Sequence, residues 1–250
     1  MRILYLGNNL VGWRVLQWLK QQGEEIVGLV LHPPNRRKYG DEIVECAGLS
    51  ANQIFDGSQL IWPEVLGAIK DLKPDIGVSS FFGYILRRDL LKLLPHSCIN
   101  IHPAFLPYNR GTYPNIWSII DGTLAGVTIH YIDEGVDTGD IIVQKQVPVD
   151  ILDTGESLYH KLEQASVDLF QEVWPAIRTG QAPRMPQPAG GSFHLTRDVE
   201  GIDEIDLQKD YKAGALINLL RARTFPPYRG AYFWHNGRKV HLRLELSYGD

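Results

Sequence analysis

Residues 2–31 read RILYLGNNLVGWRVLQWLKQQGEEIVGLVL, an apolar run, an amphipathic stretch and a second apolar run. In the middle stretch, apolar residues recur at intervals of three or four, which is the period of a helix. They are Leu10, Val11, Val15, Leu16 and Leu19. Gly23 follows them in the position of a helix C-cap. The stretch therefore predicts a strand, a helix and a second strand, the unit that builds parallel sheets covered by helices.

The same alternation continues along the chain and predicts an α/β fold with a Rossmann-like, doubly wound and mostly parallel sheet. The expected helices cover 60–72, 88–94, 113–121, 155–177 and 211–222, and the further expected strands cover 75–79, 97–102, 126–132 and 141–149. Residues 179–192 are rich in Pro, Gly and Gln, which is typical of a linker or an extended arm. The pair Asn236-Gly237 lies between two apolar runs and predicts a β-hairpin. We therefore expect a core over 1–185 and a small extension over 186–250, with a helix and this hairpin.

Composition excludes several classes of protein. The 250 residues are 44% hydrophobic and 22% charged, which is typical of a globular protein and not of a disordered chain or a coiled coil. The formal net charge of −4 gives no overall basic footprint for a nucleic-acid partner. The longest apolar runs fall short of a membrane span, and the two cysteines are far apart, so we expect a cytoplasmic protein with free thiols and no membrane partner.

Motifs for three common chemistries are missing from the sequence. The turn Gly7-Asn8-Asn9-Leu10-Val11-Gly12 is at best a degenerate dinucleotide loop, and there is no Walker phosphate loop. No GxSxG nucleophile elbow is present. His96 and His102 lack partners at metal-binding spacing, so no metal is expected.

The stretch Asn100-Ile101-His102-Pro103 ends one of the predicted strands. Because side chains alternate along a strand, Asn100 and His102 point to the same face. Ligands of open α/β sheets bind beyond the carboxyl ends of the strands. This amide and imidazole are therefore candidates for a ligand site, although polar residues that only end a strand are the more common case.

The loop Asp133-Glu134-Gly135-Val136-Asp137-Thr138-Gly139-Asp140 carries four acids within eight residues. Taken alone, such a loop is more often a solvated turn with carboxylate caps. Together with Asn100 and His102 it predicts one chemistry: the imidazole accepts a proton, a carboxylate orients it, and the amide donates to a developing oxyanion. The residues alone leave both interpretations open.

The motif NIHPxxLP, the strand Gly-Val-Thr-Ile-His and the loop Asp-Glu-Gly-Val-Asp-Thr-Gly resemble the N10-formyltetrahydrofolate-dependent formyltransferases over roughly residues 1–180. The family includes methionyl-tRNA formyltransferase, glycinamide ribonucleotide formyltransferase and the nucleotide-sugar N-formyltransferases. The resemblance implies that Asn100, His102 and Asp137 are the catalytic residues. Asp137 lies seven residues after His130, and the neighbouring acids Asp133 and Asp140 do not fit that spacing. His130 itself we interpret as a core histidine, with a role beside Asp137 as the alternative.

The resemblance also implies a co-substrate, N10-formyltetrahydrofolate, and a folate pocket. The residues expected to form that pocket are Phe82, Gly83, Tyr84, Ile85, Leu86, Asp133 and Glu134. Main-chain groups of Ile85 and Leu86 would then hydrogen-bond to the edge of the pterin. Replacing any of the three catalytic candidates with alanine is expected to lower the rate by orders of magnitude while the chain still folds.

The C-terminal stretch favours a nucleotide-linked amino sugar as the acceptor. Residues 181–250 have nearly balanced charge, whereas binding to a tRNA backbone needs clustered cations. The segment LRARTFPPYRGAYF (220–233) and the loop PYNRG (107–111) resemble those of short nucleotide-sugar N-formyltransferases. The residues expected to contact the acceptor are Tyr108, Asn109, Arg110, Tyr228 and Arg229.

The implied activity is formylation of a dTDP- or GDP-linked 4-amino (or 3-amino) deoxysugar for surface polysaccharide or O-antigen synthesis. The alternatives are a methionyl-tRNA formyltransferase and, from other classes, a non-catalytic module that binds folate or a nucleotide sugar or a Rossmann-type dinucleotide binder. The open edges of the terminal hairpin predict pairing with a second copy, so we expect a homodimer. The base, the sugar epimer and the position of the amine are left open.

Overall fold

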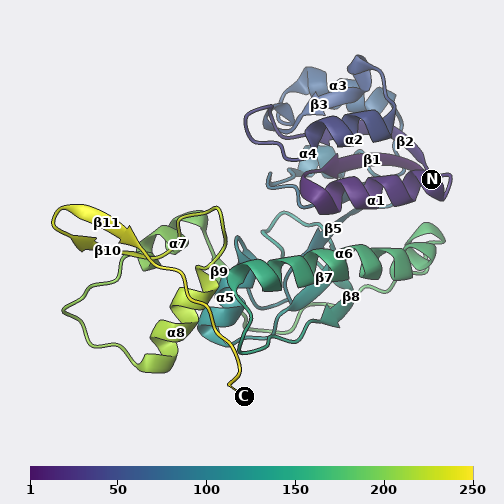
Figure 1. Cartoon of the computed structure of the whole chain (residues 1–250). Helices are drawn as coiled ribbons and strands as arrows, with labels where there is room; N and C mark the ends of the chain where they lie inside the picture. The colour runs from purple at the N-terminus through teal and green to yellow at the C-terminus, as the bar shows by residue number, and fades with distance from the viewer. Residues whose placement is uncertain (250) are drawn as a thin grey trace. The chain divides into compact units, whose positions relative to one another are not determined.

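The computed structural model describes residues 1–249 and confirms the α/β fold with a mostly parallel central sheet (Figure 1). Within these residues, seven strands form this sheet in the order β3-β2-β1-β4-β5-β7-β8. They are β1 (Arg2–Gly7), β2 (Glu25–Leu31), β3 (Ile54–Asp56), β4 (Ile76–Ser80), β5 (Cys98–His102), β7 (Gly126–Tyr131) and β8 (Ile141–Gln146). The pairs from β3 to β5 are parallel and β5 pairs with β7 antiparallel. The order 3-2-1-4-5 is that of a Rossmann sheet.

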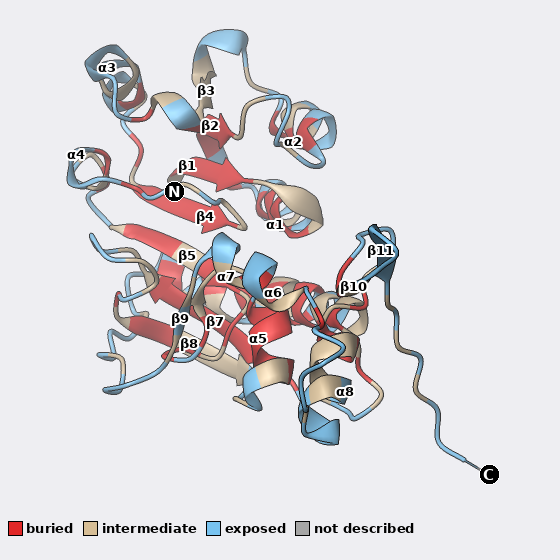
Figure 2. Cartoon of the chain, turned by 90° about the vertical axis from the view of Figure 1, so that its left-hand side faces the viewer, coloured by how far each residue is buried: buried red, intermediate tan, exposed pale blue. Residues whose placement is uncertain are grey.

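Helices cover both faces of the parallel strands. The helices of the described chain are α1 (Asn9–Gln21), α2 (Gly40–Ala47), α3 (Pro63–Asp71), α4 (Arg88–Leu91), α5 (Pro114–Asp121), α6 (Gly155–Arg178), α7 (Thr196–Ile202) and α8 (Ala213–Ala222). In Figure 2, α1 and α2 lie on one side of β1, β2 and β4, and α3 and α4 lie on the other. Apolar residues of these strands pack with residues of α3 and α4 in a buried cluster that includes Leu4, Leu6, Ile69 and Leu90.

Several boundaries differ from the sequence prediction. The helix expected over 60–72 begins only at Pro63, because proline fits the first helical position, where its missing N–H is not needed. A short 3-10 turn, Gly57–Gln59, precedes it. Helix α2 and strand β3 were not predicted, because eight and three residues are too few to establish a period.

The chain divides into two compact units. The first consists of Met1–His102, Thr128–Gln144 and Glu163–Gln187, and it contains most of the central sheet. The second consists of Pro103–Val127, Lys145–Leu162 and the chain from Pro188 onward.

The second unit contains two small sheets and the C-terminal helix. The strands are β6 (Arg110–Gly111), β9 (Phe193–His194), β10 (Tyr232–His235) and β11 (Arg238–His241), paired as β6 with β9 and β10 with β11. The predicted hairpin with its Asn236-Gly237 turn is therefore present. Buried Arg221 of α8 donates from one nitrogen to the carbonyls of Asp150 and Asp153, at 2.8 and 2.9 Å. None of the helices in residues 1–249 combines the length and the apolar character that crossing a bilayer requires.

Candidate functional site

Strand register places three polar side chains in a row across the sheet. Ser79 on β4 lies opposite Asn100 on β5, and Asn100 lies opposite His130 on β7. The Ser79 hydroxyl donates to Asn100 Oδ1 at 2.9 Å, and Asn100 Nδ2 lies 3.2 Å from His130 Nε2. His102, two residues beyond Asn100, points to the same face of β5, as the alternation of side chains predicts.

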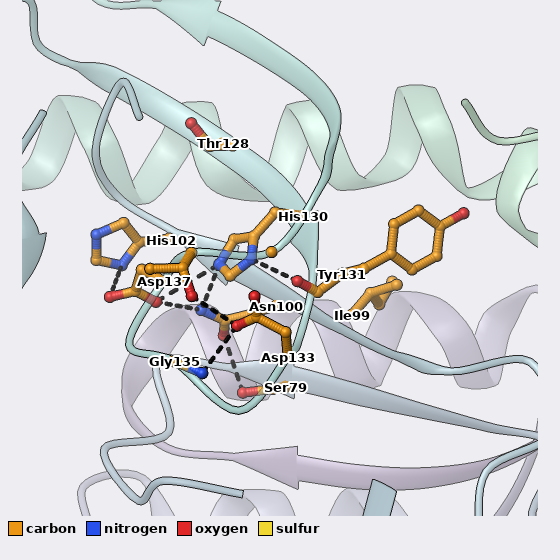
Figure 3. A network of polar contacts seen from close by, with 12 residues as sticks. Ser79, Ile99, Asn100, His102, Thr128, His130, Tyr131, Asp133, Gly135 and Asp137 are labelled. Atoms are coloured by element: carbon orange, nitrogen blue, oxygen red, sulfur yellow. Dashed lines mark hydrogen bonds and ion pairs between the residues drawn. The ribbon is translucent and has the colours of Figure 1, made fainter. Parts of the chain in front are cut away.

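The loop between β7 and β8 carries Asp137 to this row (Figure 3). Asn100 Nδ2 donates to Asp137 Oδ1 at 3.3 Å, and the other carboxylate oxygen lies 3.7 Å from His102 Nδ1. Both side chains of the second pair are largely buried, with 7% of His102 and 14% of Asp137 exposed. The structure thus brings together the three residues that the sequence predicted to be catalytic, which lie up to 37 positions apart.

His130 is part of the same network and is not only a core histidine. Its Nδ1 lies 2.8 Å from the carbonyl oxygen of Tyr131, which can only accept, so Nδ1 carries the proton. In the neutral ring, Nε2 is then an acceptor for the Asn100 amide, and it also lies 3.5 Å from Asp137 Oδ1. His130 is almost fully buried. No signal in the sequence indicated that Ser79 contacts Asn100, and the sequence favoured a purely structural role for His130. Both contacts depend on strand register, which the sequence does not show.

The remaining acids of the loop have other contacts. The Asp133 carboxylate accepts the backbone N–H of Gly135 at 3.0 Å and the Thr138 hydroxyl at 2.7 Å, so it caps the loop from within. Glu134 is exposed and lies 3.4 Å from the Arg88 guanidinium. This ion pair joins the loop to the segment after β4, so the two parts of the predicted folate pocket are neighbours.

The segment 82–86 follows β4 and contains the other predicted folate contacts. The side chain of Leu86 is buried in the apolar cluster of the first unit, whereas Ile85 is 66% exposed. Among the residues that the structure describes, the main-chain groups of Ile85 and Leu86 find no hydrogen-bond partner. Their N–H and C=O groups are therefore free to bind the polar edge of a flat ring.

His32 holds this segment in place. Its Nε2 accepts the backbone N–H of Gly83 at 3.1 Å, and its ring contacts Phe82 and Tyr84 edge-on, with centroids 5.1 and 5.0 Å away. Burial, together with the positive charge of Arg36, lowers the pKa of His32 below its ordinary value. Both effects favour the neutral ring, and an acceptor at Nε2 requires that form.

We expect the free energy of unfolding to fall as pH decreases from about 7 to about 5, and His32 to carry part of this fall. Below the ordinary histidine pKa of about 6.5, the unfolded chain takes up a proton on His32 before the folded chain does. His32→Gln keeps an acceptor but cannot titrate, so its stability should depend less on pH. Denaturant unfolding at several pH values measures this, with His96→Gln, at an exposed histidine, as the control. Identical pH dependence in wild type and His32→Gln would contradict the assignment.

The five predicted acceptor contacts all lie in the second unit. Tyr108 and Tyr228 are 38% and 52% exposed, Arg229 is exposed, and Arg110 lies on β6. Asn109 is different, because its side chain is fully buried.

Asn109 is held entirely by protein groups. Its amide nitrogen donates to the hydroxyls of Ser118 and Thr123, both at 2.9 Å, and its oxygen accepts from Ser192 at 3.0 Å. A direct contact of Asn109 with a ligand does not fit this placement. Asn109 instead fixes the 107–111 loop through these hydrogen bonds. The backbone of Asn109 is in the left-handed region, at φ 58°.

The arrangement in the first unit can move a proton and stabilise negative charge. An imidazole beside a carboxylate is the usual form of a general base, and an amide N–H beside it can donate to an oxyanion. Among residues 1–249, His, Cys, Asp and Glu side chains form no group of three suited to a metal ion.

Comparison with known proteins identifies the family. The model of the formyl transferase family matches residues 1–174, and that of the N-formyltransferase dimerization C-terminal domain matches 198–248. The chain belongs to the formyl transferase family. The first match contains the whole Asn100, His102 and Asp137 network, and the second contains α8 and the hairpin.

Individual relatives within the family include enzymes with different acceptors. The chain is 39% identical over 151 residues to the dTDP-4-amino-4,6-dideoxyglucose formyltransferase of Mycobacterium bovis, an alignment that covers 60% of this chain and 64% of the relative. It therefore spans less than two thirds of that protein. It is 32% identical over 250 residues to the methionyl-tRNA formyltransferase of Symbiobacterium thermophilum, covering 98% of this chain and 75% of the relative.

Two solved structures of the family are similar to this one. A 4-N formyltransferase from Francisella tularensis has a TM-score of 0.81 at 29% identity, with 99% of this chain and 98% of that chain covered. A formyltransferase from Anoxybacillus kamchatkensis, solved with UDP-4,6-dideoxy-4-formamido-L-AltNAc and tetrahydrofolate, has a TM-score of 0.58 at 33% identity, covering 80% of this chain and 89% of that chain.

Proposed function

We propose that this chain transfers the formyl group of N10-formyltetrahydrofolate to the amine of a nucleotide-linked amino-deoxysugar. The observation that carries the proposal is the convergence of Asn100, His102 and Asp137 in one polar network of a formyl transferase family member. The products of such an enzyme enter surface polysaccharides such as O-antigen.

The chemistry assigned to each residue follows from its contacts. The acceptor amine attacks the formyl carbon, and His102 accepts the proton that this amine sheds. The carbon–N10 bond then breaks, and N10 of the departing tetrahydrofolate takes up a proton. Asp137, 3.7 Å from His102 Nδ1, orients the ring and stabilises its positive form. Asn100 donates to the oxygen that becomes negative. Its Nδ2 contacts His130 Nε2 at 3.2 Å and Asp137 Oδ1 at 3.3 Å. We assign the N–H toward Asp137 to the developing oxyanion, because the same carboxylate also faces His102. Binding both substrates side by side supplies much of the remaining acceleration.

The segment 82–86 fits the folate that the family uses. N10-formyltetrahydrofolate supplies an electrophilic formyl carbon attached to nitrogen. The free main-chain groups of Ile85 and Leu86 match the hydrogen-bonding edge of its pterin, and the rings of Phe82 and Tyr84 offer apolar surface nearby. We assign Asp133 and Glu134 to the opposite side of this pocket. They belong to the loop between β7 and β8, which the Arg88–Glu134 ion pair holds next to the segment 82–86.

Three observations support an amino sugar over a tRNA as the acceptor. The C-terminal region matches the dimerization domain of N-formyltransferases, and its nearly balanced charge offers little to a phosphate backbone. The F. tularensis structure, which is covered almost end to end, is that of a 4-N formyltransferase. We assign Tyr108, Arg110, Tyr228 and Arg229 to the nucleotide and sugar, since aromatic faces and guanidinium groups recognise bases and diphosphates.

The proposal extends to organisation, partner and location. We assign the catalytic core to 1–185 and the extension to 186–250. A second copy is the proposed protein partner, because β11 is exposed along its length and strand edges pair readily. The free thiols of Cys46 and Cys98 favour the cytoplasm, whose reducing conditions keep cysteines unpaired.

The decisive experiment is a panel of acceptors with N10-formyltetrahydrofolate as donor. Nucleotide-linked amino sugars that differ in base, epimer and amine position are incubated with the protein, and formylated product is detected by mass. At least one amino sugar should be formylated, whereas initiator methionyl-tRNA should not. Formylation of the tRNA alone would replace the acceptor, and no formylation of any acceptor would overturn the proposed activity.

A further inference from the structure

The segment that follows α6 is an ordered arm along the first unit. Met185 forms two backbone hydrogen bonds with Ile141 at the start of β8, at 2.7 and 3.0 Å. The guanidinium of Arg184 stacks on the ring of Tyr131, 3.7 Å from its centroid, and donates to the Ser97 hydroxyl at 3.0 Å. These contacts fix the direction in which the arm passes the loop between β7 and β8.

Two residues further on, Gln187 reaches the backbone of that loop. Its Nε2 donates to the carbonyl oxygen of Asp137 at 2.8 Å and to that of Gly139 at 2.9 Å. One amide group therefore bridges two carbonyls, one on each side of Thr138, and uses both of its N–H donors.

The backbone is strained at Asp137, and it is tightly packed at Gly139. Asp137 has φ 54°, in the left-handed region that residues other than glycine rarely occupy. Gly139 packs so closely that a Cβ there would lie 1.9 Å from the carbonyl oxygen of Tyr131. Such a conformation persists only where neighbouring groups enforce it. Gln187 supplies two of those constraints.

We propose that Gln187 is a positioning residue for the Asp137 carboxylate and thereby sets the turnover rate. The proposal rests on the function proposed above. Gln187 fixes the Asp137 backbone from the carbonyl side, while the carboxylate of the same residue faces His102 and Asn100. Without the bridge, the loop samples other conformations and the carboxylate leaves its place beside the imidazole for part of the time. Gln187 contacts this loop at Asp137 and Gly139. Asp133 and Glu134, the loop's proposed folate contacts, are held by Gly135 and Arg88, so we expect donor and acceptor binding to change little.

Gln187→Met removes both donors and keeps the length of the side chain. We expect it to lower kcat by at least 10-fold, with KM for donor and acceptor within 3-fold of wild type and the melting temperature nearly unchanged. Gln181→Met is the matched control, because Gln181 is an exposed glutamine of the same arm. If Gln187→Met fails to fold, Gln187→Asn keeps the amide but is too short to bridge both carbonyls, and the same loss is expected. The proposal would be overturned if kcat were unchanged. It would also be overturned if kcat fell only in proportion to the fraction of protein that a lower melting temperature leaves unfolded.

A double-mutant cycle tests whether Gln187 acts through Asp137. In the Asp137→Ala background, Gln187→Met should change the residual rate by less than 2-fold, and full additivity would overturn the proposal.

Hydrogen exchange separates this proposal from the proposed function. Amides of residues 136–140 should exchange at least 10-fold faster in Gln187→Met than in Gln181→Met without any substrate, and equal exchange would overturn the positioning role. A wild type that formylates no acceptor but shows this difference in exchange would refute the proposed function and leave the contact of Gln187 with the loop established.

Discussion

His102→Ala is expected to lower kcat by about 10²–10⁴-fold, the contribution of a well-placed general base. An imidazole is the group in the network best suited to accept a proton from the attacking amine at neutral pH, because the ordinary pKa of histidine, about 6.5, is close to neutrality. The chain should still fold, because His102 lies at the end of β5 and is not part of the buried apolar cluster around Leu4 and Leu6.

Single-turnover formation of the formylated sugar measures this loss. Imidazole added to the His102→Ala variant should restore part of the rate, since it can occupy the vacated space and accept the proton. His96→Ala, at an exposed histidine, is the control and should retain full activity. Turnover of His102→Ala at the wild-type rate would refute the role assigned to this residue.

Asp137→Asn is expected to lower kcat by about 10³–10⁴-fold, as when the carboxylate beside a catalytic histidine is lost in other enzymes. The substitution keeps the size of the side chain but removes the charge that stabilises the protonated imidazole. Its new N–H₂ group can also face His102 Nδ1, 3.7 Å away, and select the wrong tautomer. The amide keeps only one acceptor oxygen, so it cannot accept from Asn100 Nδ2 and face His102 Nδ1 with an oxygen at the same time.

The same substitution at Asp140 is the matched control for Asp137→Asn. Asp140 lies in the same loop, and its carboxylate forms a partly exposed ion pair with Arg184, at 3.7 Å. Exposed pairs contribute about 0–1 kcal/mol to stability, so Asp140→Asn should retain nearly full activity. Equal losses for the two variants would show that the rate depends on the loop's total charge and not on the Asp137 carboxylate.

Local patterns predicted most of the regular elements. The spacing of apolar residues in α1 and α6 and the alternation in the Asn100–His102 stretch depend on the chain's own geometry, so they can be recognised without neighbours. Short elements such as β3 and β6 have too few residues to show a period, and they form because a neighbouring strand offers hydrogen bonds.

The candidate site was predicted in its residue types but not in its supporting contacts. Motifs within one loop or strand pointed to Asn100, His102 and Asp137. They gave no signal for Ser79 or Gln187, whose partners lie 21 and 50 residues away. Asn109 shows the opposite error, since a polar residue in a loop suggests a ligand contact, and only packing reveals that it is buried.

The sequence by itself determined most of the longer strands and helices and which side chains share the face of β5, because periodicity and alternation are properties of consecutive residues. The tertiary structure alone decided that Ser79 and His130 flank Asn100, that His32 holds the segment 82–86, and that Gln187 fixes the backbone of Asp137. These contacts join segments far apart in sequence, and strand register and packing bring such segments together.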